Sequence, residues 1–214
     1  METKILFNIL SFPVSEALFF TWIIMAFLCL VSFLLTRNLQ RIPRGFQHVL
    51  EIAVEGIENL VLDNMGPQGK IFIPLILTIA LYVFTANVTG VIPGAMSPTS
   101  DLNTTVALAL LVFLVGHAAE IYLKGFKAWF RGFFEPHWIL FPINVVGEIS
   151  QVLSHSFRLY GNILGGGILV GIVYMLAPYA LPVPLLAWFD VIMGAIQAAV
   201  FTLLATVYIQ IRLN

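Results

Sequence analysis

The sequence predicts an all-α membrane protein with five membrane-crossing helices and one interfacial amphipathic helix, forming a single integral membrane domain over residues 1–214. The first observation is composition: 60% of the residues are hydrophobic and only 10% are charged, whereas about a quarter of the residues in a soluble domain are charged. The second is a set of five apolar segments, each close to or above the roughly 20 residues that a helix needs to cross a bilayer. The net charge of −1 offers no basic surface for nucleic acid, so the expected partner is the lipid bilayer.

Short polar connections separate the five predicted spans. The spans cover residues 17–35, 71–93, 104–123, 138–177 and 185–211. Residues 43–65 differ, because their apolar side chains recur at helical spacing and their acidic side chains lie largely off that face. We expect this amphipathic helix to lie along the membrane interface. Because this helix is acidic, anionic lipid would not attract it to the interface. Contact with a protein partner explains a position at the interface at least as well.

The distribution of Lys and Arg predicts the orientation of the chain. If the segment 138–177 crosses the membrane once, only Lys4 lies on one side and eight basic residues lie on the other: Arg37, Arg41, Arg44, Lys70, Lys124, Lys127, Arg131 and Arg212. Cytoplasmic loops carry an excess of basic residues. The N-terminus is therefore expected outside the cell and the C-terminus in the cytoplasm.

The segment 138–177 contains 40 residues, which as one helix would be roughly 60 Å long. It either breaks near Gly165–Gly167 or forms one steeply tilted helix. Two upright spans would move Arg212 outside, against the charge bias. We therefore expect one long tilted helix, with a bend at the glycines left open, that forms a hairpin with the last span.

Polar residues of this long helix lie on one face, at steps of 3, 4, 3 and 4. This polar stripe consists of Glu148, Gln151, His155, Arg158 and Asn162, with Ser154 beside it. A charged side chain at the bilayer centre costs about 2.5–3.5 kcal/mol on insertion scales, so the stripe must face protein or water. Glu148 is ten residues from Arg158, roughly 15 Å along the helix, which is too far for the two to pair on this helix.

The last span carries a matching polar face, with Asp190 and Gln197 two turns apart. An antiparallel hairpin would put Gln197 at a depth comparable to that of Arg158, and Asp190 opposite Gly167. Small residues allow helices to approach closely in membranes. Those expected to do so here are Gly161, Gly165, Gly167 and Gly194.

The segment FRLYGN around Arg158 resembles the arginine motif of subunit a of F-type ATP synthases. Four further blocks resemble that family in the same order: IPRGFQ, ANVTGVIPG, SPTSDLNTTVALAL and IQAAVF. The likeness covers nearly the whole chain from about Leu35. It implies a stator subunit in the plasma (inner) membrane of a bacterium, with the tilted hairpin cupped around a ring of c subunits. Peripheral-stalk b subunits and a soluble ATPase head are the other implied partners.

The resemblance also implies how the subunit works. Two offset aqueous half-channels would pass protons or sodium ions to and from the c-ring, and an intramembrane arginine would separate them. By position, Arg158 matches that arginine, and Asn162 and Gln197 match polar positions near it. Asn87 matches a polar position in the outer half-channel. From the polar stripe, Ser154 and His155 are further candidates for the ion pathway.

Two positions depart from the family pattern. Many members carry Glu where this chain has Gly167, and His where it has Asp190, so the carboxylate has moved across the helix pair. The family's partner acid near Asn144 is also displaced, and Glu148 is the nearest candidate for the inner side. In the third span, His117 and Glu120 lie one turn apart. Glu120 is near the cytoplasmic end of the span, where its side chain can reach the membrane interface by snorkelling. One interpretation of His117 is that it lines a water path.

No motif in the sequence indicates a catalytic site of its own, a bound metal or a cofactor. There is no HExxH motif and no Gly-rich phosphate loop, and Cys29 is the single cysteine. Two other classes of protein remain open. A stand-alone ion-coupled transporter would also use an intramembrane Arg and Asp, and a structural scaffold would leave the polar faces unexplained.

Overall fold

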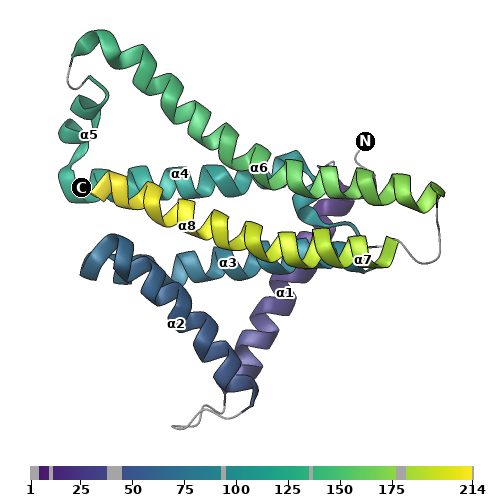
Figure 1. Ribbon diagram of the computed structural model, residues 1–214. Coiled ribbons are helices and arrows are strands. Elements are labelled where there is room, and N and C mark those ends of the chain that lie inside the picture. Colours follow the sequence, from purple (N-terminus) through teal and green to yellow (C-terminus); the bar gives the residue numbers. More distant parts are fainter. Residues whose placement is uncertain are drawn as a thin grey trace.

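The computed structural model describes residues 5–9, 12–37, 45–92, 95–134, 137–176 and 182–213. Helices account for most of this part of the chain (Figure 1): α1 (Glu16–Thr36), α2 (Phe46–Met65), α3 (Ile73–Val88), α4 (Leu102–Lys124), α5 (Phe126–Gly132), α6 (Phe141–Leu176), α7 (Pro182–Leu186) and α8 (Met193–Leu213). Short 3₁₀ turns join several of them: η1 (Gly66–Phe72), η2 (Thr89–Val91), η3 (Pro98–Ser100) and η4 (Trp138–Leu140).

Within the described residues, five helical stretches are long and apolar enough to cross a membrane, namely Glu16–Thr36, Gln47–Val91, Leu102–Lys124, Trp138–Leu176 and Pro184–Arg212. The predicted all-α membrane fold is therefore confirmed. One feature was not predicted. Strands β1 (Ile5–Ile9) and β2 (Phe12–Ser15) form a small antiparallel sheet that leads directly into α1.

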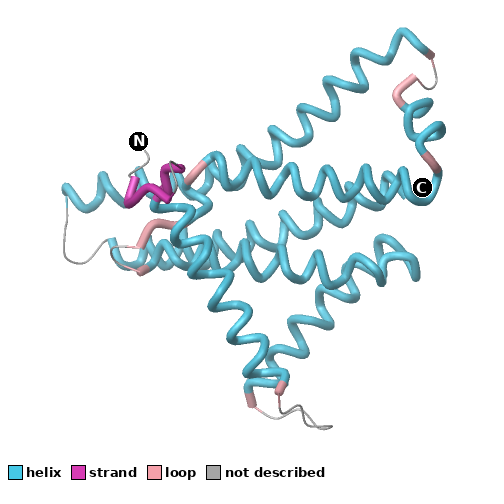
Figure 2. Tube along the Cα trace, turned by 180° about the vertical axis from the view of Figure 1, so that it is seen from behind, coloured by secondary structure: helices cyan, strands magenta, loops and turns pink. Residues whose placement is uncertain are grey.

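Helices α3, α4 and α8 run alongside one another, and the second half of α6 continues from near the start of α4 towards α7 (Figures 1 and 2). These helices and the end of α2 enclose a core of fully buried apolar side chains, which includes Val61, Ile76, Val83, Leu159, Phe201, Ala205 and Ile209. Many large apolar side chains on the outside of the helices are exposed, for example Leu30, Phe33 and Leu114. Such a surface would be unstable in water and suits contact with lipid.

Helix α6 is continuous from Phe141 to Leu176, so the glycines at 165–167 do not end it. The helix changes direction about midway, and its first half diverges from the bundle towards α5 (Figures 1 and 2). Its buried face consists of His155, Ser156, Leu159, Ile163, Gly166 and Val170. This face determines which residues meet α4 and α8.

Helix α2 begins and ends beside glycines with positive φ angles, 61° at Gly45 and 64° at Gly66, a conformation that other residues rarely adopt. Its apolar face is only partly covered. Val61 and Met65 are buried in the core, whereas Val49 remains 63% exposed. The helix runs obliquely to the bundle (Figure 1). Its position at a membrane interface stays a prediction, and residues 43 and 44 of the predicted segment lie outside the described residues.

The last span is not a uniform α-helix. Between α7 and α8 lies a π-helical segment, η5 (Ala187–Ile192). A π turn contains one residue more than an α turn, and each residue of an α-helix turns the chain by about 100°. Side chains before and after η5 therefore do not share the face that a regular helix would give them.

Candidate functional site

A hydrogen bond joins the two helices of the C-terminal hairpin. Asn162 Nδ2 on α6 donates to Gln197 Oε1 on α8 at 2.8 Å, and Gln197 is only 4% exposed. Arg158 lies one turn before Asn162 on the same helix. The two matched polar positions thus meet each other, about 6 Å along the helix axis from the arginine.

Arg158 itself lies on the exposed side of α6. Within the described residues it makes no hydrogen bond and no ion pair, and Glu148 pairs with Arg212 instead. The side chains of Phe157 and Leu153 on the same helix are also exposed. A charged group on such a surface is costly in lipid, so this side of α6 must be covered by water or by another polar protein surface.

The polar stripe divides between two environments. His155 is 3% exposed, its ring centroid lies 3.9 Å from that of Phe201, and neither ring nitrogen has a hydrogen-bond partner in the described chain. Ser154 is exposed. His155 therefore packs into the bundle, whereas Ser154 and Arg158 stay on its surface.

Within the described residues, Gly161, Gly165 and Gly167 are not points of close contact between helices. A Cβ atom at any of the three would meet nothing within 4 Å. The close approach occurs at Gly166, where a Cβ atom would lie 3.0 Å from Phe189. The reason is that the large side chains of Leu159 and Ile163 turn the neighbouring face of α6 inward.

Gly194 on α8 does lie in a close contact. A Cβ atom there would be 2.9 Å from the Cβ of Asn87, so α3 and α8 approach each other at this point. The approach also allows Asn87 Nδ2 to donate to the Gly194 carbonyl at 3.2 Å.

Asp190 does not face Gly167, as the sequence had led us to expect. It faces Gly90 in η2, where a Cβ atom would lie 3.1 Å from the carboxylate. Asp190 lies within the π-helical segment η5, on the side of the last span that meets η2, and Gly194 one turn further on contacts Asn87 of α3. Asp190 is only 8% exposed, and it has no hydrogen bond or ion pair with the described part of the chain.

Asn87 belongs to a small buried network next to this contact. Its Oδ1 accepts a hydrogen bond from Thr99 Oγ1 at 2.7 Å, and Ser97 Oγ donates to the Ala86 carbonyl at 2.7 Å. Asn87 and Thr99 are both fully buried. The network ties the end of α3 and the turn η3 to α8 beside Asp190, a role for Ser97 and Thr99 that the sequence did not indicate.

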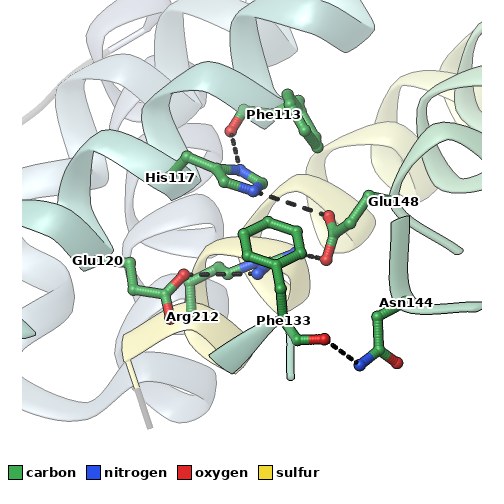
Figure 3. A network of polar contacts seen from close by, with 7 residues as sticks. All are labelled: Phe113, His117, Glu120, Phe133, Asn144, Glu148 and Arg212. Carbon is green, nitrogen blue, oxygen red and sulfur yellow. Dashed lines mark hydrogen bonds and ion pairs between the residues drawn. The ribbon is translucent and has the colours of Figure 1, made fainter. Parts of the chain in front are cut away.

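A second polar cluster lies at the Arg212 end of the bundle (Figure 3). Arg212 on α8 forms ion pairs with Glu148 on α6 and, at 3.4 Å, with Glu120 on α4. His117 on α4 points its Nε2 at Glu148 Oε2 from 3.9 Å, and its Nδ1 lies 3.0 Å from the Phe113 carbonyl oxygen. We call these four charged or titratable residues, Glu120, Glu148, His117 and Arg212, the Arg212 cluster.

A cleft of about 530 Å³ adjoins the Arg212 cluster. Its lining includes Glu120, Glu148 and Arg212, and also Asn144, which donates to the Phe133 carbonyl at 2.9 Å. The cleft has room for several water molecules among groups that hold charge. Sequence reasoning counted Arg212 only towards the charge bias. Two signals pointed to members of the cluster: Glu148 was the candidate acid for the inner side, and the spacing of His117 and Glu120 puts both on one face of α4.

The fold and these sites define a multi-pass all-α membrane protein that keeps ionisable side chains between its helices. A sequence model of the family described as "ATP synthase A chain" matches residues 18–210. The chain therefore belongs to the ATP synthase A chain family, which confirms the resemblance carried by its five motif blocks.

Curated bacterial proteins give the same result. The chain is 42% identical over 200 residues to the ATP synthase subunit a of Geobacter sulfurreducens, with 92% of this chain and 86% of that protein covered. It is 39% identical over 204 residues to the ATP synthase subunit a of Moorella thermoacetica, with 95% and 93% covered. Over 205 residues it is 41% identical to the ATP synthase subunit a 3 of Pelobacter propionicus, with 94% and 89% covered.

Proposed function

We propose that this chain is the stator subunit of a rotary ATP synthase in a bacterial plasma membrane. It forms two offset aqueous half-channels that pass protons or sodium ions to and from a ring of c subunits. The observation that carries the proposal is the position of Arg158, exposed on α6 among apolar side chains and unpaired within the described residues. A rotor surface that presents a carboxylate at the same depth would supply the missing counter-charge.

Arginine suits this position because of its chemistry. Its guanidinium cannot be deprotonated in a protein, so it cannot hand a proton on. It favours the charged form of a carboxylate beside it. A ring carboxylate that passes Arg158 must therefore release its ion into one half-channel, and it takes up another only beyond the arginine. Each elementary charge that moves through a potential of 100 mV supplies about 2.3 kcal/mol.

The two polar regions of the bundle correspond to the two half-channels. Asp190, in the contact with Gly90, serves the outer half-channel, and the cleft beside the Arg212 cluster serves the inner one. The excess of basic residues on one side supports a cytoplasmic position for the Arg212 end. Peripheral-stalk b subunits hold the chain against the ring, and the soluble ATPase head uses the rotation.

The variant Arg158→Ala tests the proposal in membranes that contain the whole complex. We expect the complex to assemble, ATP synthesis and ion-coupled ATP hydrolysis to be lost, and the passive ion leak to rise. Arg131→Ala is the matched control, because Arg131 is an exposed arginine of α5. ATP synthesis at near wild-type rates in Arg158→Ala membranes would contradict the proposal, and ion transport by the purified chain alone would favour a stand-alone transporter.

A further inference from the structure

We propose that His117 and Glu148 form a proton-binding pair in the wall of the inner half-channel. The inference rests on the proposed function and assigns a chemical role to one side of it. It begins from two buried atoms that face each other without a partner. His117 Nε2 and Glu148 Oε2 lie 3.9 Å apart, and neither has a hydrogen bond within the described residues (Figure 3).

The protonation state of the histidine follows from its other nitrogen. His117 Nδ1 lies 3.0 Å from the carbonyl oxygen of Phe113. A carbonyl oxygen can only accept a hydrogen bond, so Nδ1 carries the hydrogen and donates it. In the neutral ring, Nε2 is then an acceptor with its lone pair directed at Glu148. A carboxylate oxygen is also an acceptor, so two acceptors face each other.

One proton satisfies both atoms. A proton from water in the cleft binds to Nε2 or to Oε2 and becomes the shared hydrogen of an N–H···O or O–H···N bond, and release returns it to water. Uptake breaks one O–H bond of a hydronium ion in the cleft and leaves water, and release re-forms that bond. Such a hydrogen bond needs a separation of roughly 2.7–3.2 Å, so side-chain torsions must close the present gap. A hard cation such as sodium favours oxygen ligands. Because one of the two facing atoms is the nitrogen His117 Nε2, the pair suits a proton better than sodium.

The surrounding charges favour a single bound proton. Arg212 pairs with the other oxygen of Glu148 and also with Glu120, which leaves Glu148 Oε2 for His117. One positive and two negative charges give the Arg212 cluster a net charge of −1, and one proton brings it to zero. Uncompensated charge is unfavourable away from water.

The other side chains near the pair carry no charge. Aromatic rings surround His117, namely Phe113, Trp129 and Phe133. A small void of about 10 Å³ beside the pair is lined by Gln151 and by Tyr208, the one further titratable group. Glu148 lines both this void and the 530 Å³ cleft. Glu148 therefore lies between His117 and the cleft that cytoplasmic water would fill.

The test uses His117→Gln in the complete complex, in inverted membrane vesicles whose external pH is the cytoplasmic pH. The glutamine amide can donate to Glu148 Oε2, so it replaces the contact with a group that neither takes up nor releases a proton near neutral pH. We expect ATP-driven proton pumping to fall on the order of 100-fold in an assembled complex. The dependence of pumping on external pH should also lose one titration step. His137→Gln, at an exposed histidine, should behave as wild type.

Glu148→Gln examines the pair from its other side, so a failure of one variant to assemble does not end the test. If the two residues form one site, the double variant loses no more pumping than either single variant, whereas independent roles give losses that multiply. A pH profile of unchanged shape in either variant, or multiplicative losses, would overturn the pair and leave the stator function standing. Active Arg158→Ala membranes would remove the stator function itself.

Discussion

The carboxylate of Asp190 lies directly against the backbone of Gly90, where a Cβ atom would be 3.1 Å from Asp190 Oδ2. The contact joins the π-helical segment η5 of the last span to the turn η2 that follows α3. Glycine at position 90 allows the backbone of η2 to approach the carboxylate this closely, because a Cβ atom there would be in tight contact with it. Two predictions depend on this relationship.

Gly90→Ala should slow ion uptake at Asp190 without preventing assembly. The added methyl group crowds the carboxylate, and overpacking a filled site costs about 1–3 kcal/mol. If that cost falls on the transport step, ATP-driven pumping decreases by roughly 5- to 150-fold. Gly56→Ala is the matched control, because a Cβ atom at Gly56 on α2 meets nothing within 4 Å. Equal pumping by the two variants would show that the close contact between Gly90 and Asp190 has no role in ion transport.

Asp190→Asn should severely reduce coupled transport in an assembled complex, because an amide cannot bind and release the ion. The structure also indicates where a carboxylate can be moved. In an Asp190→Ala background, Gly90→Asp should restore part of the pumping, since position 90 lies in direct contact with the side chain at position 190. Gly167→Glu in that background should not, since Gly167 is exposed and faces away from Asp190. Rescue from position 167 alone would show that the pathway runs along α6 instead.

Much of the fold could be predicted because bilayer thickness dictates the length of each apolar run. The continuous helix α6 followed from its length and from the charge bias around it. The partner of Asp190 could not be predicted, because its contact with Gly90 depends on how the turn η2 packs against the last span, and no sequence pattern indicates that packing. Glu148 was predicted as the acid of the inner side, but its assembly with His117, Glu120 and Arg212 into the Arg212 cluster was not predicted, for another reason. Its members come from three helices far apart in sequence, and only packing brings them together.

Thr99→Val should destabilise the complex, because it leaves the buried Asn87 Oδ1 without its donor. A buried polar atom left unsatisfied costs about 1–3 kcal/mol. Thr78→Val is the matched control, since Thr78 is exposed and its hydroxyl donates only to the Pro74 carbonyl of its own helix. Thermal denaturation of the detergent-solubilised complex measures the difference. Equal midpoints for the two variants would mean that the Asn87 network contributes nothing to stability.

Impermeant labels should reach the Arg212 end of the bundle from the cytoplasm and the N-terminus from outside. The β1–β2 sheet and the end of α8 lie at opposite ends of the bundle (Figures 1 and 2). The basic residues Lys127 and Arg131 of α5 belong to the same end as Arg212 (Figure 1). The excess of basic residues at this end predicts that it lies in the cytoplasm.

The experiment uses Cys29→Ala, which removes the single cysteine, and then Lys127→Cys or a cysteine added after Asn214. A membrane-impermeant maleimide should label both in inverted vesicles and neither in intact cells, and a tag at Met1 should show the opposite pattern. If all three sites were labelled from the same side, the termini would be separated by an even number of spans, and the predicted topology would be wrong. If Lys127→Cys and the C-terminal cysteine were labelled only in intact cells, the chain would have the opposite orientation in the membrane. The His117–Glu148 pair would then belong to the outer half-channel.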